Sequence, residues 1–355
     1  MRPGFWGVCG RMECMIRRRW CACCVRTLIW VSVCFLSAVP AGAVVEPKTQ
    51  PAIDEAVALV KRGVRFEEGL GVAVDQAEAA RCYRKAADLG NTQGMVRLGL
   101  LHVFGKGVRQ DNAEASAWFQ KAIDKGDRGG YVGLGYLYRG GDDEQAVGWY
   151  RKAAELGDGD GMVCLAEMIR YGKGVGKNTG EEMKWLRKAI DAGSTHAMVL
   201  LGTTYVYGRG QVERNTGLGL ALLRNAADLG DVSAMLNLGH LYELKEGTGI
   251  AQDYSEALKW YWKAADLGAA LAMTKLGILH LEGRGIDRDS EEALKWFNKA
   301  ADLGHALAMA YLGIMYRDGV GVEKDLGKAA DYLREAAGRD CLWAKDELAK
   351  MGQTP

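Results

Sequence analysis

Hydrophobic residues recur along most of this chain with helical spacing, and the pattern itself returns about every 36 residues. In one copy Met95 is followed by Leu98, Gly99 and His102, and spacings of 3, 4 and 7 place all four on one helical face. Glycine inside such a stripe costs about 1 kcal/mol relative to alanine. We therefore expect a neighbouring helix to approach closely at that position. Further copies begin at Tyr131, Met198, Met235 and Met309.

A second helical pattern follows each copy of the first. Residues 256–268 return almost verbatim as residues 292–304, and both segments end in two alanines, an Asp, a Leu and a Gly. A tryptophan beside another large apolar residue is expected to pack in the core of this helix; it is Trp118, Trp149, Trp185, Trp260 or Trp296. Self-similarity with a period in the thirties predicts stacked helical units.

The sequence between the two helices predicts a tight turn and a capped helix start. Most copies contain Gly-x-Gly, whose first glycine suits the left-handed residue that ends a helix. An Asp or Asn at a fixed offset can accept hydrogen bonds from the free amides that open the next helix. A Glu three residues later would complete a capping box. The capping residues are Asp75, Asp111, Asn178, Asn215, Asp253, Asp289 and Asp325, and the glutamates are Glu78, Glu114, Glu181, Glu256 and Glu292.

These features predict an all-α fold, an α-solenoid in which helix–turn–helix units form a right-handed superhelix. We expect eight units, with residues 341–355 forming a capping helix and a tail. Terminal units should be atypical because one of their faces meets water. The expected units are residues 53–90, 91–126, 127–157, 158–193, 194–230, 231–268, 269–304 and 305–340.

The first 43 residues differ from the rest. Arg17, Arg18 and Arg19 precede a short apolar run, which ends near the Ala-Gly-Ala of residues 41–43. This order is typical of a secretory signal peptide, and we expect cleavage after Ala43 with residues 44–52 as a flexible lead-in. The run is short for a membrane span, so no stable span is expected after cleavage. An uncleaved anchor or a later start at Met12 or Met15 is the alternative. A periplasmic or secreted location follows from the main interpretation.

Charge and cysteine content narrow the function. Residues 1–43 hold six arginines and one glutamate, so the remainder carries a net charge of −4 rather than +1. Nucleic acid requires a basic face, and none is indicated. Only Cys82, Cys164 and Cys341 of the nine cysteines lie beyond the leader. An odd number on distant units does not suit a disulfide framework, so we expect packing residues or free thiols.

The combined motifs resemble a known family. A Leu-Gly-x-x-Tyr helix, a Gly-x-Gly turn, an Asp cap and a Trp-Tyr-x-Lys-Ala-Ala helix closed by Gly are similar to the Sel-one-like repeat, a relative of the tetratricopeptide repeat. The resemblance covers nearly the whole chain after the leader. It implies a solenoid with a concave groove that acts as an adaptor for other proteins, in signalling, envelope assembly or host contact. A cysteine-rich branch linked to β-lactam antibiotics carries a Cys pair in each repeat, which this chain lacks.

No catalytic constellation is visible in the sequence. The Gly-x-Gly turns lack the preceding strand and the Lys-Ser or Lys-Thr of a phosphate loop. His102 and His280 occupy a position that is Tyr in other copies, and no two histidines have metal-ligand spacing. Nucleophile motifs of the Gly-x-Ser-x-Gly or Ser-x-x-Lys type are missing. We therefore expect no enzyme activity, no cofactor and no metal. A hydrolase, either of the cysteine-rich branch or with a Cys–His pair from distant repeats, is the alternative.

The remaining candidate is the face of the first helices. Positions one and four residues after the glycine vary between copies in charge and size, which suits contact with a protein or peptide rather than with a neighbouring repeat. By analogy with the related repeat this stripe lines the concave face. We predict partner contacts from Tyr136, Arg139, Glu167, Arg170, His240, Glu243 and Arg317. A structural spacer without groove-dependent binding is a further alternative. The sequence names neither the partner nor the oligomeric state.

Overall fold

The computed structural model describes residues 49–352, and within that range every regular element is an α-helix. The predicted signal peptide, most of the lead-in and the last three residues lie outside the described range. The first helix begins at Gln50, so the last residues of the expected lead-in are helical. No helix of this range combines the length and apolar character that crossing a membrane requires.

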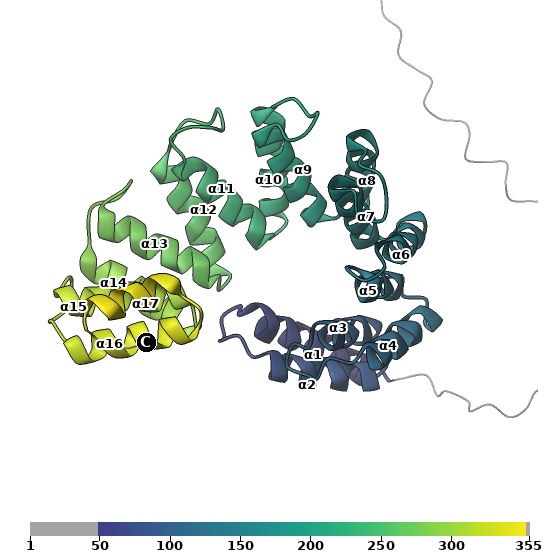
Figure 1. Cartoon of the computed structure of the whole chain (residues 1–355), viewed down its shortest axis with the longest axis horizontal. Coiled ribbons are helices and arrows are strands. Elements are labelled where there is room, and N and C mark those ends of the chain that lie inside the picture. The colour runs from purple at the N-terminus through teal and green to yellow at the C-terminus, as the bar shows by residue number, and fades with distance from the viewer. Residues whose placement is uncertain (1–48, 353–355) are drawn as a thin grey trace, which may run out of the picture. The chain divides into compact units, whose positions relative to one another are not determined.

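The helices form antiparallel pairs that follow one another along a curved path (Figure 1). Each pair has a first and a second helix, and each helix packs against its neighbours in sequence. This confirms the α-solenoid prediction. The first helices are α1 (Gln50–Glu68), α3 (Thr92–Phe104), α5 (Gly129–Tyr138), α7 (Gly159–Tyr171), α9 (Thr195–Tyr207), α11 (Val232–Glu243), α13 (Ala270–Glu282) and α15 (Ala306–Asp318). The second helices are α2 (Gln76–Asp88), α4 (Asn112–Asp124), α6 (Asp143–Glu155), α8 (Thr179–Asp191), α10 (Thr216–Asp228), α12 (Tyr254–Asp266), α14 (Ser290–Asp302) and α16 (Leu326–Gly338), and α17 (Leu342–Lys350) packs on α16.

The glycine of the first helix lets the second helix of the same unit approach closely. A Cβ atom on Gly99 would lie 2.4 Å from Cε1 of Phe119, and one on Gly239 would lie 2.5 Å from Cε1 of Tyr261. Real Cβ atoms do not approach carbon atoms this closely, so only glycine fits beneath the ring. The close approach expected from the sequence is therefore present, and the approaching element is the partner helix of the same unit.

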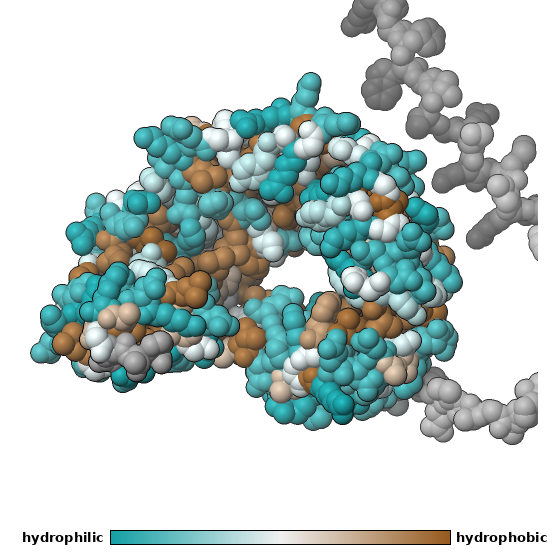
Figure 2. Space-filling model, in the orientation of Figure 1, coloured by the Kyte–Doolittle hydropathy of each residue, from teal (hydrophilic) through white to brown (hydrophobic). Residues whose placement is uncertain are grey.

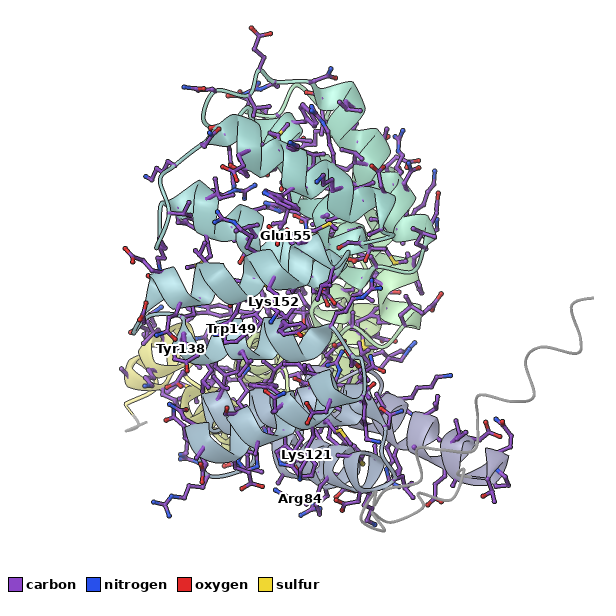
Figure 3. The ribbon with its side chains drawn as sticks, turned by 90° about the vertical axis from the view of Figure 1, so that its right-hand side faces the viewer. Arg84, Lys121, Tyr138, Trp149, Lys152 and Glu155 are labelled. Carbon is purple, nitrogen blue, oxygen red and sulfur yellow. The ribbon has the colours of Figure 1, made fainter. Side chains whose placement is uncertain are left out.

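In the second helices that have a tryptophan, the large residue after it is more deeply buried than the tryptophan. Phe119, Tyr150 and Phe297 are fully buried. Trp118, Trp260 and Trp296 are also buried, whereas Trp149 and Trp185 are half-buried. In all five of these helices the lysine three residues later covers the tryptophan ring, as Lys152 does for Trp149 (Figure 3). The sequence-based assignment of the tryptophans as core residues thus holds in part. The lysine and the tryptophan ring thereby form a cation–π contact.

The Asp and Asn caps form as predicted, but the capping box does not. Asp111 Oδ1 accepts hydrogen bonds from the backbone amides of Ala113 and Glu114 at 3.0 and 2.9 Å. The amide of Asp111, which Glu114 should have capped, instead donates to the carbonyl of His102 at 3.0 Å. Glu114 is thereby free to accept from Arg84 of the preceding unit at 3.0 Å. The acid thus serves contact between units.

Beyond the first unit, the Gly-x-Gly turns pack on the start of the second helix of the preceding unit. A Cβ atom on Gly107 would lie 2.1 Å from the carbonyl oxygen of Gln76, and one on Gly174 would lie 2.1 Å from that of Asp143. Both glycines also have positive φ, at 66° and 63°. The third unit has no such turn, because α5 ends at Tyr138 and α6 begins at Asp143.

Candidate functional site

A cleft of about 540 Å³ lies on the first helices of the second to fifth units. In Figure 2, apolar residues reach the surface at the place of α3, just below the central gap of this view. We call this depression the inner cleft. It is lined by Gln93, Val96, Arg97 and Leu100 of α3, Asp127 before α5, Gly129, Val132 and Tyr136 of α5, Asp158 before α7, Asp160, Val163, Cys164 and Glu167 of α7, and His196 of α9.

The third unit brings these helices together. Its first helix, α5, contacts both α3 and α7 directly. Two glycines of α5 allow this: a Cβ atom on Gly130 would lie 2.6 Å from the carbonyl oxygen of Phe119, and one on Gly133 would lie 2.2 Å from its ring. Gly133 also occupies the position that is Arg97 on α3 and Cys164 on α7. The missing side chain leaves space between its neighbours.

The charges of the inner cleft are unevenly compensated. Arg97 lies 2.9 Å from Glu67, and Glu167 lies 3.4 Å from Arg139. Asp127 and Asp158 instead accept only backbone hydrogen bonds, at 2.8 Å from Gly129 and 2.7 Å from Gly161. Burial raises the pKa of Asp158, and the nearby carboxylates of Asp160 and Asp127 raise it further, although the amide of Gly161 acts in the opposite direction. The end of the cleft at the N-termini of α5 and α7 therefore carries carboxylates that no ion pair compensates within the described residues.

The structure brings three of the seven predicted partner-binding residues to the inner cleft. Tyr136 and Glu167 line it, and Arg139 reaches it through Glu167. Tyr136 packs edge-on against Tyr150, with ring centroids 5.7 Å apart. Arg170 lies apart, in a second depression of about 350 Å³.

The other predicted residues mainly connect neighbouring helices. Arg170 Nε lies 2.7 Å from Glu182. Glu243 accepts hydrogen bonds from the hydroxyl of Tyr261 and from Lys275, at 2.6 and 2.9 Å.

At the far end of the array Arg317 pairs with Asp318 at 2.7 Å and also with Glu347 of the capping helix. His240 is exposed, with Nδ1 3.9 Å from Glu243. His240, Glu243 and Arg317 do not line the inner cleft. Contact of any of the seven residues with a partner stays a prediction.

Sequence reasoning missed the cleft residues that lie before the glycine. Val96 and Arg97 of α3, and Val163 and Cys164 of α7, stand two and three positions before the glycine or its equivalent. A signal was available, since these positions lie one helical turn from Leu100 and Glu167 on the same face. The acids at the loop ends carried no such signal, because Asp158 also reads as a helix cap.

Cys164 and His196 both line the inner cleft, which bears on the hydrolase alternative. The Cys164 thiol is buried and donates to the hydroxyl of Tyr136 at 3.4 Å. Burial raises the pKa of this thiol to about 12, whereas a nucleophilic cysteine needs its pKa lowered. Cys82, Cys164 and Cys341 are all free, and no group of acids, histidines and cysteines within residues 49–352 is arranged to hold a metal ion.

Comparison with known proteins gives a consistent family. The Sel1 repeat matches residues 56–91, 92–127, 130–158, 160–194, 195–231, 232–268, 270–305 and 306–340. No curated protein matches the chain.

Two solved structures share the solenoid. A Sel1 repeat protein from Oxalobacter formigenes is 28% identical, with a TM-score of 0.55 over 85% of this chain and 88% of that one. A protective antigen of uropathogenic Escherichia coli with an SLR fold is 32% identical, with a TM-score of 0.53. That match covers 84% of this chain but only 65% of the antigen. Eight consecutive matches and the helix-pair architecture lead to one conclusion: this chain belongs to the Sel1 repeat family.

Proposed function

We propose that this protein is an exported scaffold that binds a partner polypeptide in the inner cleft. The observation that carries the proposal is the cleft itself, whose walls come from four successive units. A surface built in this way can follow an extended segment over several residues. Sel1 repeats mediate protein interactions in general, and proteins of this family are generally not catalysts, which agrees with a binding role.

The lining of the inner cleft supports a polypeptide ligand. Half-buried apolar side chains of Val96, Leu100 and Tyr136 lie beside charged groups of Arg97 and Glu167. Interfaces between proteins combine an apolar centre with a polar rim in the same way. The ion pairs from Arg97 to Glu67 and from Arg139 to Glu167 hold neighbouring first helices together and so keep the cleft preformed.

Photo-crosslinking from defined positions tests this function. A photoreactive amino acid would replace Gln93, which is exposed in the inner cleft, or Glu155, which is exposed on the second helix α6 (Figure 3). In cells that produce the full chain, we expect discrete adducts from position 93 and none from position 155. Equal adducts from both positions, or none from position 93, would contradict the proposal.

Export is the second part of the proposal. It is supported by the charged, apolar and small-residue order of residues 17–43, which is typical of a secretory signal peptide. The mass of the protein recovered from cell envelope and medium should correspond to a chain that begins at Val44. Recovery of the uncleaved chain from the cytoplasm would contradict this part without affecting the cleft.

A further inference from the structure

We propose that the inner cleft selects a polypeptide segment that presents a lysine or arginine beside aliphatic residues. This inference rests on the proposed function and names the chemistry of the partner. The argument depends on two features of the cleft: its uncompensated acids and its apolar wall.

The uncompensated acids lie at the N-terminal ends of α5 and α7. Asp127 and Asp158 use their carboxylates to cap the helix starts, and no lysine or arginine pairs with either within the described residues. Asp160, in the first turn of α7, is exposed and makes no side-chain hydrogen bond or ion pair within the described residues. By contrast, Arg97 and Glu167 are neutralised by partners on neighbouring helices. The guanidinium of Arg128 lies beside Gly157 at this end but forms no ion pair with these acids within the described residues. A cation from a ligand would compensate them.

The apolar wall runs beside this acidic end. Val96 and Leu100 lie one turn apart on α3, and Tyr136 faces them from α5, all of them half-buried. Val132 and Val163 lie behind this row and are buried. A segment with an aliphatic residue next to its basic residue can place the first on the wall and the second among the acids.

A peptide-binding experiment on the full chain tests the inference. The probe is a short fluorescent peptide in which lysine alternates with leucine and valine, and fluorescence anisotropy gives its dissociation constant. One control peptide has glutamate for each lysine, and another has serine for each leucine and valine. We expect the lysine–aliphatic peptide to bind at least tenfold more tightly than either control, with affinity falling as salt concentration rises.

Variants of the protein locate the binding. Asp160→Lys should weaken binding about tenfold, because one exposed attraction is lost and a repulsion of similar size replaces it. Glu144→Lys is the matched control, since Glu144 and Asp160 are both the second residue of their helices and both exposed, but Glu144 lies on α6 outside the cleft. It should leave binding unchanged. Circular dichroism melting of both variants confirms that they fold.

The outcomes separate this inference from the proposed function. Equal binding of the lysine and glutamate peptides, or equal loss in both variants, would overturn the choice of a basic segment. If position 93 still gives crosslinked adducts, the cleft binds a partner of another chemistry. Absence of adducts from position 93 contradicts the proposed function itself, and the inference falls with it.

Discussion

Replacing Gly277 by alanine should destabilise the protein, although alanine is the better helix former. Gly277 lies in α13, and a Cβ atom there would sit 2.6 Å from Cε1 of Phe297 and 2.8 Å from its Cδ1. The Phe297 ring is fully buried and is stacked on Tyr311, with centroids 4.8 Å apart and planes 1° from parallel. The ring therefore has little room to move away from an added methyl group.

The magnitude follows from two opposing effects. Overpacking a filled core costs about 1–3 kcal/mol, and alanine recovers about 1 kcal/mol of helix propensity. Gly277→Ala should thus lose about 1 kcal/mol of unfolding free energy. Gly148, inside α6, has no atom within 4 Å of its hypothetical Cβ, so Gly148→Ala should gain the propensity alone. The two variants should differ by about 2 kcal/mol.

Urea unfolding followed by circular dichroism measures the difference. Because repeat arrays can unfold in segments, hydrogen exchange of α13 and α14 should accompany the unfolding curves and locate the effect. Combining Gly277→Ala with Phe297→Leu completes a double-mutant cycle, in which the smaller side chain should relieve about 1 kcal/mol of the strain. If both glycine variants stabilise the protein equally, the ring does not constrain the glycine and the reasoning fails.

Two further predictions concern the inner cleft. The pKa of Asp158 is raised in the folded state, so the charged carboxylate destabilises the folded protein. As the pH falls through the folded pKa, protonation of Asp158 stabilises the wild type. The gain is complete below the ordinary carboxyl pKa of about 3.9. Asp158→Asn keeps a capping group and should raise the melting temperature at pH 7, with the difference vanishing near pH 3.5; a lower melting temperature at pH 7 would contradict this. Burial of Cys164 and the pKa of about 12 predict that iodoacetamide labels half-buried Cys341 first and Cys164 only on unfolding, as peptide mass spectrometry can follow. Early labelling of Cys164 in the native protein would favour the hydrolase alternative.

The solenoid could be predicted from the sequence because its requirements recur in every unit. Helical spacing, the glycine beneath the ring, and the Asp or Asn cap each have a local cause that a single repeat displays. The relative burial of neighbouring aromatic residues was less accessible. Trp296 and Phe297 are both large and apolar, and only the packing of α14 on α13 decides that Phe297 lies beneath Gly277. The lysine three residues after each tryptophan was the available hint that a cation covers one face of the indole ring.

The candidate site was harder to predict because its residues interact across units. Arg139, Arg170 and Glu243 looked free in the sequence, since their partners lie 12 to 32 residues away. Whether such side chains meet depends on how each unit is rotated against the next, which no local pattern specifies. The same rotation brings Asp127 and Asp158 near each other from two different loops. The sequence analysis selected the positions one and four residues after the glycine of each first helix. Of the residues that line the cleft, these positions therefore identified only a part, such as Tyr136 and Glu167.

The short third unit explains why the inner cleft lies where it does. In other units the Gly-x-Gly turn packs on the start of the preceding second helix, as Gly174 does on Asp143. The third unit has only a short loop, and Gly140 in that loop has no neighbour within 4 Å of a hypothetical Cβ. Contact with the second unit must then come from α5 itself, and Gly130 and Gly133 supply it by closing on Phe119. Gly133 also leaves α5 without a side chain between Arg97 and Cys164. Shortening the turn and opening the cleft are thus two consequences of one change in the repeat.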